Sequence, residues 1–173
     1  GYLWDPVEPR AAMRTAIDVA RAAGRKVALT LSDAFVISRH GPDFLAEMEA
    51  GRIDILFANE VEICALSGTD DFEAAVATIA AKVPLLVCTR GEHGAIAVEG
   101  GVRTEVQAEP VSHLVDTTGA GDLFASGVFA GMAQGRSMAD CLTMGAVCAA
   151  EIISHYGARP EADIAALVKA RLG

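Results

Sequence analysis

Residues 116–122 read Asp-Thr-Thr-Gly-Ala-Gly-Asp and lead directly into Leu-Phe-Ala-Ser-Gly-Val-Phe-Ala at 123–130. Two glycines bracket an alanine in this stretch, so the backbone can adopt positive φ and come close to a ligand. An acid, Asp122, stands where the apolar helical pattern begins. The stretch therefore predicts a loop that feeds the N-terminus of a helix.

The start of a helix exposes unpaired N–H groups and a partial positive charge. The amides of Gly119, Ala120 and Gly121 are therefore candidates for holding a phosphate or the charge that develops on it during transfer. Asp122, beside these amides, would accept a proton from an attacking hydroxyl. The alternative is that Asp122 only caps the helix, as aspartate often does. The stretch alone does not decide between the two, because short glycine-rich motifs also occur by chance.

Composition limits the class of protein. The chain has 173 residues, 52% of them hydrophobic, and a mean hydropathy of +0.35, which predicts one compact domain over residues 1–173 rather than disorder. A net charge of −9 disfavours a surface for nucleic acid or for an anionic membrane. No apolar run is long enough to span a bilayer, and no signal-peptide pattern opens the sequence, so a cytoplasmic protein is expected.

The cysteines and histidines show no spacing typical of metal ligands. They are Cys64, Cys88, Cys141 and Cys148, and His40, His93, His113 and His155. The cysteines stand among apolar residues without a C-x-x-C pair, which predicts small buried side chains in a reducing compartment. The histidines form no H-E-x-x-H or similar pattern, so none is given a catalytic role.

Strands alternate with helices along the chain. Strands are predicted at 26–31, 53–58 and 85–89, a hairpin at 95–106, and helices at 7–23, around 44–51, and at 71–81, 121–134, 138–154 and 161–172. Residues 1–6 read as the end of another strand, and the helices at 121–134 and 138–154 look largely buried. This order predicts an α/β fold with a mainly parallel sheet and helices on both faces, in which ligands bind beyond the carboxyl ends of the strands.

Polar residues follow two of these predicted strands. Asn59 and Glu62 come directly after one strand and share one face of a helical turn, while Thr89 and Gly91 end the next. Together with Asp122 they would line one edge of the sheet, which favours Asp122 as a base rather than a cap. Glu62 read alone is equally an ordinary exposed helix residue.

The motifs match a known family. No G-x-x-x-x-G-K-[ST] loop is present, and residues 119–124 lack the third glycine of the dinucleotide fingerprint, which disfavours a P-loop enzyme or a Rossmann dehydrogenase. The chain instead resembles the C-terminal part of the PfkB, or ribokinase-like, carbohydrate and nucleoside kinases. Residues 116–122 match the second signature of that family, Asn59 and Glu62 match its N-x-x-E motif, and residues 89–94 resemble its T-x-G-x-x-G loop. The spacing to Gly145-Ala146 and Gly157-Ala158 is similar to that of the adenosine-kinase-like branch.

The resemblance implies an ATP-dependent phosphotransferase that moves the γ-phosphoryl group to a hydroxyl, a primary alcohol, of a sugar or nucleoside. Asp122 would be the base, and the amides of Gly119, Ala120 and Gly121 would form the anion hole, which suits a reaction that depends on positioning and charge stabilisation. Two alternatives remain open: a nucleotide-binding or regulatory module without catalysis, and a kinase for a sugar phosphate.

The same resemblance implies cofactor sites. Asn59 and Glu62 would act on the ATP phosphates through Mg²⁺ and bound water. The nucleotide would also lie near Thr89, Gly91, Gly94 and Ala146. A monovalent cation, K⁺, would be held by Asp116, Thr118 and Gly157.

Members of the family are longer than this chain. The part with the first signature, most substrate contacts and a small β lid would precede Gly1. We therefore expect the chain to be the C-terminal nucleotide-binding and catalytic portion of a longer kinase, with little activity alone and without most of the residues that select the acceptor. The lid often forms the dimer contact in the family, so a homodimer through it is a further expectation.

Overall fold

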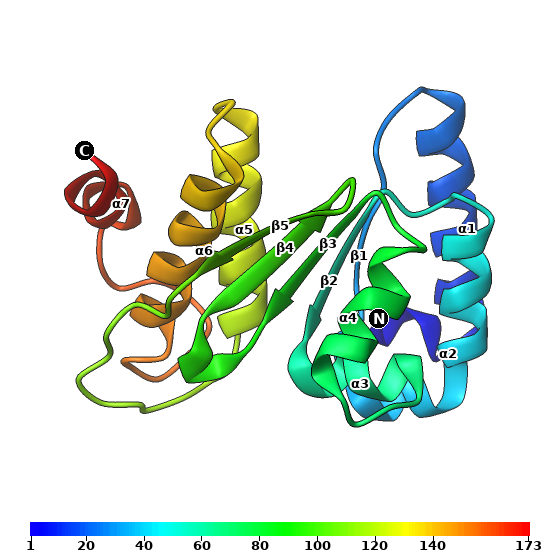
Figure 1. The fold of residues 1–173 in the computed structure, drawn as a ribbon, viewed down its shortest axis with the longest axis horizontal. Coiled ribbons are helices and arrows are strands. Elements are labelled where there is room, and N and C mark those ends of the chain that lie inside the picture. The colour runs from blue at the N-terminus through cyan, green and yellow to red at the C-terminus, as the bar shows by residue number, and fades with distance from the viewer. The chain divides into compact units, whose positions relative to one another are not determined.

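The computed structural model describes residues 1–173 and contains seven α-helices, two 3₁₀ helices and five strands (Figure 1). The chain divides into two compact units. The first comprises Gly1–Cys88 and Val98–Arg103, and the second comprises Thr89–Ala97 and Thr104–Gly173. The single domain over residues 1–173 stays a prediction.

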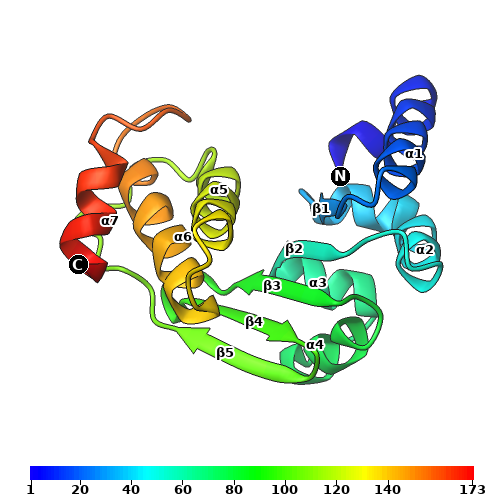
Figure 2. The same ribbon diagram turned by 90° about the horizontal axis from the view of Figure 1, so that it is seen from above.

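The strands form a sheet in the order β1-β2-β3-β4-β5. Their bounds are Ala28–Thr30 for β1, Ile55–Asn59 for β2, Leu85–Thr89 for β3, Ala95–Glu99 for β4 and Val102–Val106 for β5. β1 and β2 are parallel, with Leu29 opposite Leu56. β4 and β5 form the predicted hairpin (Figure 2), whose Gly100 and Gly101 have φ of +55° and +82°, the conformation that suits a two-residue hairpin turn. The α/β class with a mostly parallel sheet is confirmed.

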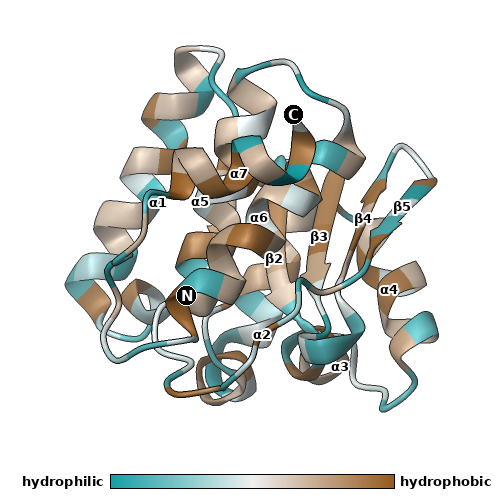
Figure 3. Cartoon of the chain, turned by 90° about the vertical axis from the view of Figure 1, so that its left-hand side faces the viewer, coloured by the Kyte–Doolittle hydropathy of each residue, from teal (hydrophilic) through white to brown (hydrophobic).

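Strands β2 and β3 carry the polar residues expected in the site. Every residue of β2 before Asn59 and of β3 before Thr89 is buried, as expected for strands covered on both faces. Figure 3 shows the hydrophobic colouring of β3. Asn59 is exposed and Thr89 is half-buried. Each strand therefore ends with a polar residue that is more accessible than the residues before it.

The helices follow the predicted pattern, but two of them begin more than two residues from the expected start, and a short helix stands where a strand was predicted. In the first unit they are α1 (Val7–Ala22), α2 (Ala34–Glu49), α3 (Glu60–Ser67) and α4 (Phe72–Ala80), and in the second α5 (Ala120–Ala133), α6 (Met138–Ile152) and α7 (Ile164–Leu172). Residues Tyr2–Trp4 form a 3₁₀ helix, η1, so the strand predicted there is wrong. Helix α2 begins at Ala34 because Asp33 accepts a hydrogen bond from the Phe35 amide at 2.7 Å. Helix α7 begins only after Asp163, which accepts from the Ala166 amide at 3.1 Å.

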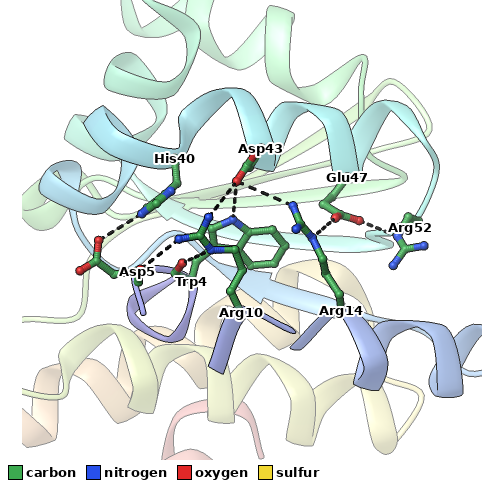
Figure 4. Close-up of polar contacts among 8 residues, drawn as sticks. All are labelled: Trp4, Asp5, Arg10, Arg14, His40, Asp43, Glu47 and Arg52. Carbon is green, nitrogen blue, oxygen red and sulfur yellow. Dashed lines mark hydrogen bonds and ion pairs between the residues drawn. The ribbon is translucent and has the colours of Figure 1, made fainter. Parts of the chain in front are cut away.

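A network of side chains explains why the first residues do not form a strand (Figure 4). Trp4 is completely buried and donates its indole N–H to Asp43 of α2 at 3.1 Å. Arg14 of α1 contacts the buried Glu47 at 3.2 Å, and Arg52 contacts the same carboxylate at 2.5 Å. The buried indole of Trp4 and its hydrogen bond to Asp43 thus hold the segment before α1 against α2, while the contact between Arg14 and Glu47 holds α1 itself.

Helices α5, α6 and α7 of the second unit lie side by side in that order (Figures 1 and 2). Glycines allow α5 and α6 to approach closely: a Cβ at Gly127 would lie 2.6 Å from the Met144 carbonyl oxygen, and one at Gly145 would lie 2.8 Å from that of Phe124. The prediction of extensive burial is confirmed for α6 but wrong for α5, most of which is exposed or half-buried.

The side chains of α7 and the cysteines differ in their burial. In α7 Val168 is buried, whereas Leu167 is 39% exposed. Of the free cysteines, three are buried and Cys64 is half-buried. None of the helices combines the length and the apolar character that crossing a membrane requires.

Candidate active site

Gly119 decides the geometry of the stretch at 116–122. It is the N-cap residue of α5 and has φ of +83°, a conformation that glycine adopts far more readily than other residues. A Cβ on Gly119 would lie 2.9 Å from the Cβ of Ala158, in the loop after α6. Position 119 therefore needs glycine for its backbone conformation and for the close approach of a second loop.

Three N–H groups at the start of α5 have no acceptor within the protein. They belong to Gly119, Gly121 and Asp122. The Ala120 amide, in contrast, donates to the Thr117 carbonyl oxygen at 3.1 Å, so the expectation that it is free to bind an anion is corrected. Three unpaired amides at a helix N-terminus, where the helix dipole is positive, form a binding place for an anion.

The Asp122 side chain stands in the first turn of α5 beside these amides. α5 has no side-chain cap, so the alternative that Asp122 caps the helix is wrong. Asp122 is exposed, and its carboxylate makes no hydrogen bond or ion pair within the protein. A carboxylate with no protein partner can accept a hydrogen bond, and then a proton, from the hydroxyl of a ligand.

Asp116 organises the loop before α5. Its Oδ1 accepts from the Thr118 amide at 2.9 Å and from the Thr118 hydroxyl at 2.7 Å, and its Oδ2 accepts from the Gly157 amide at 3.4 Å. These hydrogen bonds, with that of the Thr118 hydroxyl the strongest influence, hold the pKa of Asp116 below its usual value.

The three residues grouped as a cation site in the sequence therefore lie together. Their carboxylate, hydroxyl and carbonyl oxygens are the donors that a hard cation prefers. The Oδ2 of Asp116 has only the long contact with Gly157, so it keeps a lone pair for a cation. The donor set thus fits K⁺.

Asn59 and Glu62 form a capping box at the start of α3. Asn59 Oδ1 accepts from the Glu62 amide at 2.8 Å, and Glu62 Oε2 accepts from the Asn59 amide at 3.0 Å. The Asn59 side-chain amide also donates to Glu62 Oε1 at 2.9 Å. Glu62 is 7% exposed, so the alternative of an ordinary exposed helix residue is wrong.

The Glu62 carboxylate is suited to contact a magnesium ion through a water molecule bound to that ion. Burial is the main reason why the pKa of Glu62 lies above its usual value, and a nearby divalent cation would offset that effect. Each of its oxygens accepts one hydrogen bond from Asn59 and so keeps a lone pair for a metal-bound water. No group of three or more His, Cys, Asp and Glu side chains could hold a metal by itself, but Mg²⁺ in phosphate sites commonly uses one or two carboxylates, waters and the substrate phosphates.

The loop after β3 is a closed turn. The Arg90 amide donates to the Gly94 carbonyl oxygen at 2.8 Å. Gly91 has φ of +56°, is exposed and has open space where a Cβ would stand, whereas Gly94 has φ of +84° and a Cβ there would lie 2.0 Å from the Val106 carbonyl oxygen. Gly94 therefore fixes the loop against the end of β5, while Gly91 leaves its outer face open.

A cavity of about 680 Å³ lies in the second unit, between the segment 109–113, α6 and α7. Ala146, expected near the nucleotide, is buried and does not line it, although the next residue of α6, Val147, does. The volume is within the range of small-molecule pockets.

The structure brings predicted site residues together within each unit. Asn59 contacts Glu62 in the first unit, and Asp116, Thr118 and Gly157 adjoin the start of α5 in the second. The shared edge for Asn59, Glu62, Thr89, Gly91 and Asp122 stays a prediction.

The sequence analysis did not identify two residues that support the turn before α5. Ala158 packs under Gly119, and Glu151 accepts hydrogen bonds from the loop that carries Ala158. A signal for Glu151 was present, because it is the one charged residue in the run 141–153.

Comparisons with known proteins agree with these motifs. A family model described as "pfkB family carbohydrate kinase" matches residues 3–165. The cytidine kinase of Thermococcus kodakarensis is 36% identical over 118 residues, which cover 66% of this chain and 42% of that protein.

Solved structures are similar over nearly the whole chain. The adenosine kinase of Sinorhizobium meliloti is 40% identical, with a TM-score of 0.95 over 98% of this chain and 52% of that one. The ribokinase of Arabidopsis thaliana, solved with ribose and ATP, is 26% identical, with a TM-score of 0.70 over 88% of this chain and 50% of that one. The chain thus spans about half the length of the proteins that it resembles.

Proposed function

The chain belongs to the pfkB family of carbohydrate kinases, and we propose that the protein containing it transfers the γ-phosphoryl group of ATP to a primary hydroxyl of a sugar or nucleoside. The observation that carries this proposal is that two features lie together at the start of α5. Three backbone amides there have no acceptor, and the carboxylate of Asp122 in the first turn has no partner in the protein. The names of the related proteins, cytidine kinase and adenosine kinase among them, support a nucleoside or sugar acceptor.

Asp122 accepts the proton of the acceptor hydroxyl while the hydroxyl oxygen attacks the γ-phosphorus of ATP. The bond between the γ-phosphorus and the oxygen that bridges it to the β-phosphate breaks, and ADP leaves with that oxygen. The amides of Gly119, Gly121 and Asp122 donate to the oxygens of the phosphoryl group while their negative charge is redistributed. Gly119 is the N-cap of α5 and Gly121 and Asp122 lie in its first turn, so these donors are part of the folded backbone and need little reorganisation at the moment of transfer.

The nucleotide side of the site is assigned to the other motifs. Asn59 holds the Glu62 carboxylate in place through its hydrogen bond at 2.9 Å, and Glu62 would hold Mg²⁺ through a bound water. When bound, Mg²⁺ neutralises charge on the phosphates. Thr89, Gly91 and Gly94 border the phosphates and ribose, and the open outer face of Gly91 gives a ligand room to approach. ATP as the donor is supported by its presence in the related ribokinase structure, and the cytoplasm, where ATP is available, is the proposed location.

A panel of acceptors tests the function. The complete gene product is incubated with ATP, Mg²⁺ and ribose, fructose, adenosine, cytidine or a sugar phosphate, and phosphorylated product is detected by mass spectrometry. We expect product with a sugar or nucleoside. Product only with the sugar phosphate would change the acceptor class. Nucleotide binding in a parallel titration without product from any acceptor would instead identify a binding or regulatory module.

A dependence on monovalent cations is also expected. Asp116 is charged at neutral pH, as an aspartate of ordinary or lowered pKa is, and Thr118 and Gly157 adjoin it. We expect turnover to be about tenfold faster in potassium chloride than in tetramethylammonium chloride of equal ionic strength, and Asp116→Ala to abolish that difference. Initial rates in the two salts measure the effect, and equal rates for the unaltered protein would refute the site.

A further inference from the structure

Glu151 lies near the end of α6 with its side chain only 6% exposed. Its Oε1 accepts hydrogen bonds from the backbone amides of Glu161 and Ala162, each at 2.8 Å. His155 Nε2 lies 3.2 Å from the same oxygen. One buried carboxylate oxygen therefore gathers donors from both ends of the loop that connects α6 with α7.

The charge on Glu151 is maintained despite its burial. Burial would raise the pKa of Glu151, but the amides of Ala162 and Glu161 and the His155 side chain together lower it below the usual value. Hydrogen bonds to a charged acceptor are stronger than those between neutral groups. The contacts with the loop are thus charge-assisted.

The loop at 154–162 has few other anchors. Every residue in it is exposed except the half-buried His155, and Tyr156 is 81% exposed. A segment that buries no apolar side chain gains little from the hydrophobic effect, so its hydrogen bonds decide where it lies. Those with Glu151 hold both its beginning and its end.

The same loop contacts the turn that precedes α5 at two points. The Gly157 amide donates to Asp116 Oδ2 at 3.4 Å. Ala158 packs so closely under Gly119 that a Cβ on Gly119 would lie 2.9 Å from the Ala158 Cβ. Since Gly119 begins the row of unpaired amides, a displacement of the loop would change the support beneath them.

We propose that Glu151 is a positioning residue of the anion-binding turn, acting through the loop at 154–162. It does not touch the substrate. Its buried carboxylate fixes the loop, the loop supports Asp116 and Gly119, and these set the direction of the amides. This inference rests on the proposed function for its catalytic consequence, but its structural part can be measured without any activity.

Amide hydrogen exchange on the complete gene product, without ligands, tests the structural part. In Glu151→Ala we expect exchange to rise about tenfold or more at 155–162, because charge-assisted hydrogen bonds are lost. We expect a similar rise in the segment 116–121, where the hydrogen-bonded amides of Thr118 and Ala120 report the change. Glu151→Gln keeps an oxygen that can accept from both amides, so it should restore most of the protection. Asp163→Ala is the matched control: it frees the Ala166 amide beside the same loop and should loosen only the start of α7.

Each outcome of the exchange experiment either supports or overturns the positioning role of Glu151. Faster exchange at 155–162 with no change at 116–121 would overturn the proposal, as would no change in either segment. If Glu151→Ala fails to fold, Glu151→Gln decides: it should raise exchange in both segments by a smaller factor, and a rise confined to one of them, or to neither, would refute the coupling.

Kinetics separate this proposal from the proposed function. We expect Glu151→Ala to lower kcat on the order of tenfold to 100-fold, with the KM of the acceptor changed by less than about twofold, because misplaced groups affect the transition state most. Glu151→Gln should recover most of kcat. If the unaltered protein phosphorylates nothing, the proposed function fails, yet coupled exchange would still support the positioning role. If activity is present but Glu151→Ala leaves kcat unchanged, the positioning role fails alone.

Discussion

Replacing Asp122 with asparagine is expected to lower turnover of the complete gene product by about 10²–10⁴-fold, the usual contribution of a general base. Asparagine has nearly the same shape but cannot take the proton of the attacking hydroxyl. The Asp122 side chain is exposed and makes no hydrogen bond within the protein, so the substitution removes no contact that holds the fold. The measurement is the initial rate with the acceptor found in the panel, together with an ATP titration, in which affinity should be nearly unchanged.

Asp140→Asn is the matched control for this variant. Asp140 stands in the first turn of α6 as Asp122 does in that of α5, so both substitutions remove one negative charge from a helix N-terminus, an effect of about 0.3–1 kcal/mol on stability. Only Asp122→Asn should affect turnover. A rate for Asp122→Asn within a few-fold of the unaltered protein would show that Asp122 is not the base.

The second large effect is expected at Gly94, where alanine should destabilise the fold by about 3 kcal/mol or more. Two causes act together. The backbone there has φ of +84°, which disfavours any residue with a Cβ, and that Cβ would lie 2.0 Å from the Val106 carbonyl oxygen, closer than any real contact. Because the obstacle is backbone, either the loop or the end of β5 must move. The midpoint of urea unfolding measures the loss.

Gly91→Ala provides the comparison within the same loop. Gly91 also has positive φ, +56°, but open space surrounds the position of its Cβ, so only the conformational cost of about 1–2 kcal/mol applies. The difference between the two variants is the part due to packing against Val106. If both variants unfold at the same urea concentration, the close approach has no energetic importance, and Gly94 is required for its φ alone.

Local signals predicted most of the secondary structure. The alternation of strands with helices, the hairpin at Gly100 and Gly101 and the buried strands before Asn59 and Thr89 follow from periodicity and turn residues, which act between neighbours in the chain. The predictions of secondary structure failed where a residue distant in the sequence determines the local conformation. Residues Tyr2–Trp4 form η1 instead of a strand, and Trp4 is held by Asp43 of α2. The sequence near Trp4 contains no sign of that partner.

The candidate site divides in the same way. The sequence by itself determined which residue types stand at the start of α5, that glycines allow an anion to approach the backbone there, and that Asn59 and Glu62 can share a helical turn. The tertiary structure decided that Glu62 is buried and that Glu151 and Ala158 support the turn. The reason is physical: conformational preference and helix dipoles act over a few adjacent residues, whereas burial and hydrogen bonds between loops exist only after distant segments have come together.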